Sequence, residues 1–209
     1  MRARPISPSS LVDELAERIM PVRGSSWARV AVDGAPAARP DELADALVDP
    51  LRVRGREVLR VSAGDFLRPA SLRLEFGRDD PDLYYTDWLD VGGLIREVLA
   101  PLEPGGTGRV LPALWDSAVD RAARAGYRRL PPGGVVVLDG AILLGRGLPF
   151  DYVVHLWMSP GALERRTEPG RRWMLPAYAR YAAEAAPARV ANVVVRVDDP
   201  RHPALVEEM

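Results

Sequence analysis

Residues 30–44 read VAVDGAPAARPDELA, and this stretch decides the fold. The apolar run that ends at Val32 has the composition of a buried strand, and the segment from Pro40 onward has that of a helix start. A short loop that begins at Gly34 joins them. A strand, a loop and a helix in this order predict an α/β fold, with the loop at the carboxyl end of the strand.

This loop has the layout of a phosphate-binding loop but few of its residues. The pattern G-x-x-x-x-G-K-[ST] wraps phosphates with backbone N–H groups, reaches the β- and γ-oxygens with its Lys, and holds Mg²⁺ with its hydroxyl. Aligned on Gly34, the chain has Arg39 for the second Gly, Pro40 for the Lys and Asp41 for the hydroxyl residue. It is therefore a degenerate Walker A loop.

The first turn of the predicted helix also disfavours an anion. Pro40 fits the first helical position but supplies no N–H. Asp41 and Glu42 each stabilise a helix start by about 0.3–1 kcal/mol. Their carboxylates supply the negative charge that a bound phosphate would otherwise place at the helix N-terminus. The alternative is that Arg39 reaches toward a phosphate as a displaced cation.

Composition narrows the classes of function. The 209 residues include no Cys, and all 28 basic residues apart from His are Arg. Any cation that acts on a ligand must therefore be Arg, which favours bidentate phosphate or carboxylate recognition. The net charge of −1 gives no basic field for nucleic acid, and no apolar run reaches the roughly 20 residues of a membrane span. We expect one cytoplasmic domain over residues 1–209 that binds neither nucleic acid nor membrane.

Short apolar strands alternate with helical segments along the chain. We expect strands at residues 27–32, 57–62, 135–139, 151–158 and 190–197. We expect helices within residues 1–24 (with Ser7 as N-cap and Pro8 as first helical residue), at 40–51, at 89–99, and in a segment at about 160–185. This alternation predicts a three-layer α/β domain, with a central parallel sheet flanked by helices.

Further motifs follow the loop in a fixed order. They are VSAGDFLRP (61–69), DPDLYY (80–85), LEPGG (102–106), WD (115–116), VLDG (137–140), an Arg-rich stretch (165–172) and VRVDDP (195–200). In this order the chain resembles the uridine kinase and phosphoribulokinase group of P-loop kinases over nearly its whole length. The resemblance implies a P-loop NTPase-like fold, a nucleotide-binding transferase, ATP or GTP with Mg²⁺ as cofactors, and a nucleoside, nucleotide or sugar-like ligand. A homo-oligomer is a further expectation.

The resemblance assigns roles to two carboxylates. Asp65, in the DFLRP motif, would be the catalytic base for the acceptor hydroxyl. On the residues alone, it could equally cap the turn after Gly64. Asp139 ends a strongly apolar strand and would contact Mg²⁺; its alternative role is to hydrogen-bond the turn at Gly140.

The resemblance also implies two groups of binding residues. The acceptor pocket would use Arg68, Tyr84, Tyr85, Trp115, Asp116 and Asp120. Trp115 and Asp116 resemble the family's [YW]-D-x-x-x-H element, in which Asp120 replaces the His that goes with pyrimidine nucleosides. The aromatic rings of this group, together with Trp88, have ordinary packing as their alternative.

The nucleotide side would use Gly34, Arg39, Arg165, Arg171 and Arg172, with Arg166 acting on the transferring phosphate. The last four Arg residues would belong to a lid-like segment at about 160–185, which residues 168–170 (EPG) would make mobile. A solvated helix end is the alternative. We expect His155 and His202 to be structural.

Three functions remain open. The first is a uridine kinase-like protein whose ATP-dependent kinase activity is impaired or absent, that is, a pseudokinase candidate. The second is an active but atypical nucleoside kinase that uses Arg39 and the Arg-rich lid, with Asp65 as base. The third is a non-catalytic ligand-binding or interaction protein.

Overall fold

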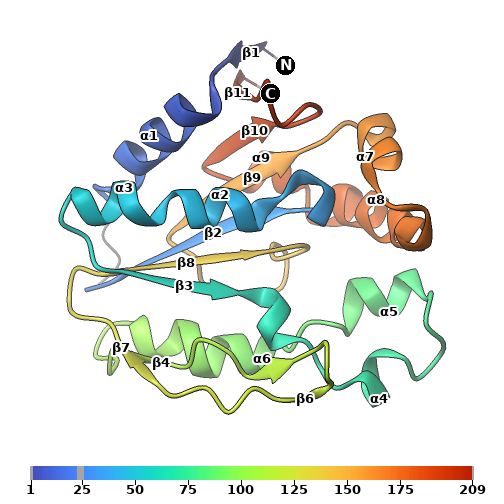
Figure 1. Ribbon diagram of the computed structural model, residues 1–209, viewed down its shortest axis with the longest axis horizontal. Coiled ribbons are helices and arrows are strands. Elements are labelled where there is room, and N and C mark those ends of the chain that lie inside the picture. The colour runs from blue at the N-terminus through green and yellow to red at the C-terminus, as the bar shows by residue number, and fades with distance from the viewer. Residues whose placement is uncertain (1, 23–25, 209) are drawn as a thin grey trace.

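The computed structural model describes residues 2–22 and 26–208, and its centre is a seven-stranded sheet (Figure 1). From one edge to the other, the strands are β1 (Arg2–Pro5), β11 (Ala204–Glu208), β10 (Val193–Arg196), β9 (Tyr152–Trp157), β2 (Ala28–Gly34), β8 (Val135–Gly140) and β3 (Val58–Ser62). Neighbours from β10 to β3 pair in parallel, and β11 and β1 add antiparallel strands at one edge. The predicted parallel sheet is confirmed.

Side chains of the central strands alternate between two apolar cores. In β2, Val30 and Val32 belong to the core on one face of the sheet, and Ala31 belongs to the core on the other. In β8, Val137 and Leu138 divide in the same way. Because both faces are covered, these strands are apolar without interruption, which made them recognisable in the sequence.

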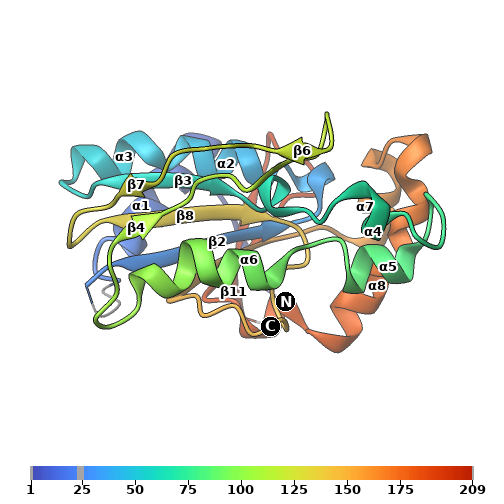
Figure 2. The ribbon, with the colours of Figure 1, turned by 90° about the horizontal axis from the view of Figure 1, so that it is seen from below.

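Helices cover both faces of the sheet (Figures 1 and 2). One face carries α1 (Pro8–Ile19), α2 (Pro40–Ala46) and α3 (Val48–Val53). The other face carries α6 (Val91–Leu94) and the π-helical turn η3 (Ile95–Leu99) that continues it. The three-layer α/β architecture is therefore as predicted.

The N-terminal segment, expected to be helical within residues 1–24, begins with a strand that the sequence patterns did not indicate. This strand, β1, pairs with β11 from the other end of the chain. It is four residues long and contains two Arg residues, so it carries no apolar signal. Helix α1 then begins as predicted, because the Ser7 Oγ accepts a hydrogen bond from the Ser10 N–H at 3.1 Å. Residues 1 and 23–25 lie outside the described part of the chain.

Two helices differ from their predicted bounds. The helix expected at 40–51 is broken at Leu47 into α2 and α3. Pro50 lacks the N–H that would bond the Ala46 carbonyl, and its ring crowds that carbonyl. The helix expected at 89–99 begins at Val91, because the Asp90 carboxylate accepts a hydrogen bond from the Gly93 N–H at 2.8 Å and caps the helix there.

The remaining elements gather mainly around the carboxyl ends of the parallel strands (Figure 1). The helices are α4 (Ala70–Arg73), α5 (Pro81–Thr86), α7 (Pro160–Arg166), α8 (Leu175–Glu184) and α9 (Pro187–Val190). The 3₁₀ turns are η1 (Pro36–Ala38), η2 (Ala63–Phe66), η4 (Ala100–Leu102) and η5 (Pro169–Met174). Two small hairpins pair β4 (Arg109–Val110) with β7 (Arg128–Arg129) and β5 (Trp115–Asp116) with β6 (Arg121–Ala122). Within the described residues, none of the helices has the length and apolar character to cross a membrane.

Candidate functional site

A cavity of about 690 Å³ lies where β2, β3 and β8 end. Gly34, Ser62 and Asp139 contribute to its floor, and residues of α5 and of the lid-like segment contribute to its walls. This is the crevice at which open parallel sheets bind ligands. We call it the central cavity.

The loop after β2 contains the 3₁₀ turn η1 and a left-handed residue, Arg39, that leads directly into α2. Gly34 packs closely against β9, since a Cβ there would lie 3.0 Å from the Leu156 Cβ. Arg39 adopts a left-handed conformation (φ 58°, ψ 55°), which a Gly would adopt at little cost. Its exposed guanidinium turns back onto its own helix and lies 2.7 Å from the Glu42 carboxylate. Pro40 is buried, so no cation extends from the position of the missing Lys.

The carboxylate of Asp139 already has a cationic partner. Arg60 Nη1 lies 2.6 Å from Asp139 Oδ1, and the Asp139 side chain is only 7% exposed. The same guanidinium reaches Asp45 on α2, with an Nε–Oδ1 distance of 2.8 Å. Ser62 Oγ donates a longer hydrogen bond of 3.4 Å to the other oxygen of Asp139. Arg60 therefore lies between β8 and α2, beside the carboxylate that would contact a metal ion.

The residues at this end of the cavity do not form the usual set that holds Mg²⁺ and a nucleoside triphosphate. The loop offers neither an ammonium nor a hydroxyl at the expected positions, and the Asp139 carboxylate is ion-paired with Arg60. Among the described residues, no group of three or more His, Asp or Glu side chains is placed to hold a metal ion.

Asp65 stands at the end of η2, beside the central cavity. Its neighbours Gly64 and Leu67 line that cavity, and its own backbone carbonyl accepts a hydrogen bond from the Leu114 N–H at 3.0 Å. Burial, followed by the negative charges of Asp139 and Asp116, raises the pKa of the Asp65 carboxyl. A carboxyl with a raised pKa suits a general base, so the geometry is compatible with the role that the resemblance implies.

An aromatic cluster joins α5 to the lid-like segment. The Tyr84 ring packs edge-on against Trp88, Trp173 and Tyr178, with centroid distances of 5.1, 5.7 and 5.9 Å. The hydroxyl oxygens of Tyr84 and Tyr178 lie 2.7 Å apart, and burial raises the pKa of both hydroxyls. Tyr84, Trp88 and Trp173 also line the central cavity. The sequence indicated Tyr84 and Trp88, but not Trp173.

The hairpin residues expected in the acceptor pocket form hydrogen bonds within the hairpin and to α4. Asp120 accepts hydrogen bonds from the Ala70 N–H at 2.8 Å and from the Trp115 indole at 3.0 Å, and these bonds lower its pKa. Asp116 accepts a hydrogen bond from the Ala118 N–H at 3.0 Å and so closes its own turn. None of Trp115, Asp116 and Asp120 lines the central cavity.

Two more residues of the expected acceptor set also lie outside the cavity lining. Tyr85 packs under the guanidinium of Arg180, whose Cζ lies 4.5 Å from the ring centroid. Arg68 pairs with Asp87, with an Nη1–Oδ1 distance of 2.9 Å. Their roles in binding stay predictions.

The four Arg residues of the lid-like segment divide into two pairs. Arg166 and Arg171 line a smaller cavity of about 240 Å³ beside the loop, together with Arg39, and Arg171 also faces the central cavity. Arg165 and Arg172 are exposed and line neither. The structure thus brings Arg39, Arg166 and Arg171 together, at the place where the resemblance puts a nucleotide.

Sequence reasoning missed two guanidiniums in the central cavity. Arg73 is 8% exposed, and its Cζ lies 5.0 Å over the Trp88 ring. Arg146 donates hydrogen bonds to the carbonyls of Ile142 at 2.8 Å and Thr86 at 3.2 Å, and burial lowers its pKa. It forms no ion pair with any side chain in the described residues. In the sequence, Arg146 stands between two glycines and reads as an exposed turn.

The wall formed by these residues has more donors than acceptors. Trp88 Nε1 is buried without a hydrogen-bond partner in the described structure. A desolvated cation without a counter-charge and a buried donor without an acceptor are both costly, and a ligand with anionic oxygens would satisfy both. This part of the cavity therefore favours an anionic or oxygen-rich ligand.

A buried network ties the loop strand to α8. Asp33 is fully buried and accepts hydrogen bonds from the Leu143 N–H at 3.0 Å and the Tyr181 hydroxyl at 2.9 Å. His155 Nδ1 lies 2.7 Å from the same carboxylate. Burial, followed by the charge of Asp33, raises the pKa of Tyr181. His155, expected to be structural, thus packs within this network, whereas the exposed His202 pairs with Asp199 at 3.0 Å.

Solved structures with kinase names share this fold. A protein named as a possible uridine kinase from Bacillus stearothermophilus aligns with a TM-score of 0.70 and 20% identity, covering 88% of this chain and 97% of that one. A protein named as a candidate fructose transport system kinase from Silicibacter sp. TM1040 aligns with a TM-score of 0.57 and 24% identity, covering 88% and 93%. The YGR205w protein aligns with a TM-score of 0.59 and 10% identity, covering 97% and 100%.

These likenesses show the fold: the chain has the P-loop kinase-like α/β architecture that the resemblance implied. No protein-family model matches the sequence, and no curated protein matches it.

Proposed function

We propose that the chain is a uridine kinase-like protein that binds a small molecule in the central cavity and has impaired or absent ATP-dependent kinase activity. The observation that carries this proposal is the contact of 2.6 Å between Arg60 and Asp139, next to a loop with Pro40 in place of the Lys. The guanidinium neutralises the carboxylate that a metal ion would need. At the end of the cavity where a phosphate donor would bind, the charges of Asp139 and Arg39 are thus already paired with side chains of the protein.

The acceptor side supports ligand binding. It combines aromatic faces, from Tyr84, Trp88 and Trp173, with guanidiniums that include Arg73 and Arg146. Aromatic faces stack on planar rings, and guanidiniums hold phosphate or carboxylate oxygens. The ligand class is therefore a nucleoside, nucleotide or sugar-like molecule, with preference for one that carries an anionic group.

An active but atypical kinase is the second candidate, and Asp65 favours it. The raised pKa of this carboxyl fits a base that accepts a proton from a sugar hydroxyl. Arg166 and Arg171 lie across the smaller cavity from the loop, where they could bind phosphate oxygens. The ion pair between Arg39 and Glu42 argues against this second candidate, because it occupies the guanidinium that would bind phosphate.

Calorimetric titration and a turnover assay together test the proposal. Uridine, uridine monophosphate and ribose 5-phosphate would be titrated into the protein, and turnover would be measured with ATP or GTP and Mg²⁺. We expect at least one of the three ligands to bind and no turnover above background. Arg146→Gln should weaken that binding by about tenfold or more, since a hydrogen bond to a charged group contributes about 1.5–3 kcal/mol. Arg128→Gln, at an exposed position outside the cavities, is the matched control and should leave the affinity unchanged.

Each other outcome identifies another function. Turnover that Asp65→Asn abolishes would establish the atypical kinase. Absence of binding by all three ligands, with or without Mg²⁺, would overturn the ligand-binding proposal and favour an interaction protein.

A further inference from the structure

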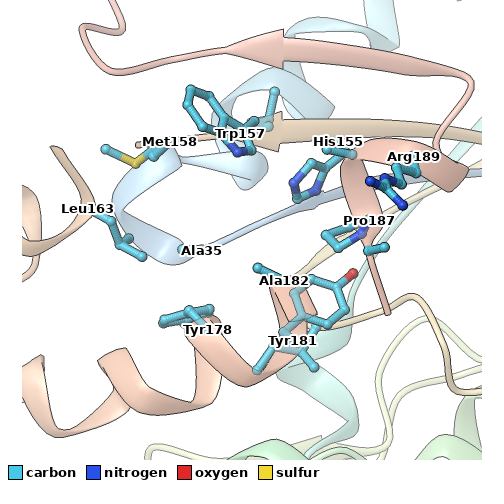
Figure 3. Close-up of a pocket in the computed structure, with 14 residues that line it drawn as sticks. Ala35, His155, Trp157, Met158, Leu163, Tyr178, Tyr181, Ala182, Pro187 and Arg189 are labelled. Carbon is cyan, nitrogen blue, oxygen red and sulfur yellow. The ribbon is translucent and has the colours of Figure 1, made fainter. Parts of the chain in front are cut away.

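A second cavity, of about 210 Å³, lies between β9, α8 and α9 (Figure 3). Of the residues that line it, only Ile142 also lines the central cavity. Most of its wall is apolar and includes Leu156, Met158, Leu163 and Pro187. It is thus distinct from the central cavity and from Asp139, although Ala35 and Tyr178 also line the smaller cavity beside the loop.

Three side-chain N–H or ring-nitrogen groups of this cavity have no hydrogen-bond partner among the described residues. The Tyr178 hydroxyl pairs with Tyr84, and the Tyr181 hydroxyl both donates to Asp33 and accepts from the Leu144 N–H at 3.1 Å. His155 projects from β9 into the cavity, opposite Tyr178 and Ala182 of α8 (Figure 3). These three groups are the second nitrogen of His155, the guanidinium of Arg189 and the indole N–H of Trp157.

The geometry of the Asp33–His155 pair fixes which imidazole nitrogen faces the ligand. The Asp33 carboxylate accepts the proton on Nδ1, at 2.7 Å, so Nε2 is the nitrogen without a partner in the described residues. A neutral ring presents a lone pair at Nε2, and a protonated ring presents an N–H. A carboxylic acid satisfies both states, because the proton it brings stays between its oxygen and Nε2.

The charge of the cavity favours the ionised form of such an acid. Arg189 is exposed on α9 and lines the cavity, and it forms no ion pair among the described residues. No Asp or Glu is among the described residues that line it. A carboxylate would thus meet a guanidinium and an imidazole, with the Asp33 carboxylate bound to the opposite nitrogen of that imidazole.

The size and the walls define the rest of the ligand. An apolar cavity of about 150 Å³ is enough to hold benzene. A cavity of about 210 Å³ therefore holds one ring or a short branched chain with its acid group. We propose that this cavity is a binding site for a small monocarboxylate with an apolar body, held by Arg189 and His155 Nε2. This site is separate from the proposed ligand site in the central cavity.

Titration of benzoate into the full-length protein tests this site, with benzyl alcohol and benzamidine as neutral and cationic probes of similar size. We expect benzoate to bind at least about tenfold more tightly than either. Saturating uridine monophosphate and ribose 5-phosphate should leave benzoate affinity unchanged, since they probe the other cavity. Equal binding of all three probes would reduce the site to an apolar void and overturn the proposal, as would no binding at all.

Three variants assign the contacts. Arg189→Gln should weaken benzoate about tenfold or more, while Arg172→Gln, an exposed Arg outside the cavity, should not. His155→Asn keeps a side-chain amide that can donate to Asp33 but removes Nε2, and it should weaken benzoate without unfolding the protein. Ala182→Phe, at an exposed position on α8, should fill the cavity and abolish binding. Unchanged affinity in both Arg189→Gln and Ala182→Phe would place benzoate elsewhere.

Discussion

Arg60 and Asp139 stand on the neighbouring parallel strands β3 and β8, and their side chains meet at 2.6 Å beside the central cavity. The pair is largely shielded from solvent, with the Asp139 side chain 7% exposed and that of Arg60 21% exposed. Removing one partner of such a pair leaves a buried charge that nothing else compensates fully. The pair therefore bears on the stability of the fold and, under the proposed function, on whether Asp139 can contact a metal ion.

Replacing Arg60 should destabilise the protein and free the Asp139 carboxylate. Arg60→Ala is expected to lower the free energy of unfolding by about 3 kcal/mol, as for other buried pairs that lose one member. Denaturant unfolding measures this, and adding Asp139→Asn should restore most of the loss. Mg²⁺ should raise the melting temperature of Arg60→Ala but not that of the parent protein. A variant as stable as the parent would contradict this account.

Asp65→Asn should stabilise the protein at neutral pH. A carboxyl whose folded-state pKa is raised opposes folding once the pH exceeds its ordinary pKa of about 3.9. The penalty grows as pH rises through the window up to the raised pKa, and it is absent below the unfolded value. Because Asp65 is half-exposed, we expect less than about 1 kcal/mol, or at most about 2–4 °C in melting temperature.

Melting curves of Asp65→Asn at pH 3.5 and pH 7 check the sign. The gain should appear at pH 7 and vanish at pH 3.5. Asp79→Asn, at an exposed position, is the control and should change neither curve. A loss of stability at pH 7 would mean that Asp65 makes favourable contacts that outweigh its burial.

Tyr181→Phe should cost more than Tyr178→Phe, although the two tyrosines lie one turn apart on α8. The Tyr181 hydroxyl donates to the buried Asp33 carboxylate, and a hydrogen bond to a charged group contributes about 1.5–3 kcal/mol. The Tyr178 hydroxyl pairs only with the neutral Tyr84, which corresponds to about 0.5–1.5 kcal/mol. Urea unfolding of the two variants measures both losses in the free energy of unfolding. An equal loss, or a larger loss for Tyr178→Phe, would contradict the prediction.

Restoring the loop alone should not restore nucleotide binding. The triple variant Arg39→Gly, Pro40→Lys and Asp41→Ser recreates the G-x-x-x-x-G-K-[ST] pattern but leaves Arg60 on Asp139. We expect binding of ATP with Mg²⁺ in calorimetry only when Arg60→Leu is added. The triple variant with Arg128→Leu, at an exposed position outside the cavities, serves as the matched control. Tight binding by the triple variant alone would show that Mg²⁺ can displace Arg60 from the Asp139 carboxylate.

The sequence predicted the parallel strands because each is a short apolar run, and it predicted the cap at Ser7 because capping is local. It missed the break at Leu47, where Pro50 interrupts an otherwise helical pattern, and it missed β1, whose partner is at the other end of the chain. In the site, it indicated Asp65, Tyr84 and the loop residues from motifs. It gave no signal for Arg73 or Arg146, whose positions have no motif.

By itself, the sequence determined the five parallel strands and the loss of the phosphate-loop residues, since both depend on residues close together in the chain. Only the tertiary structure decided which distant charges meet. Arg60 and Asp139 are 79 residues apart, and Asp33 and Tyr181 are 148 apart. Such pairs depend on strand register and on the face of the sheet from which each side chain projects. Local periodicity carries no information on a partner so far along the chain.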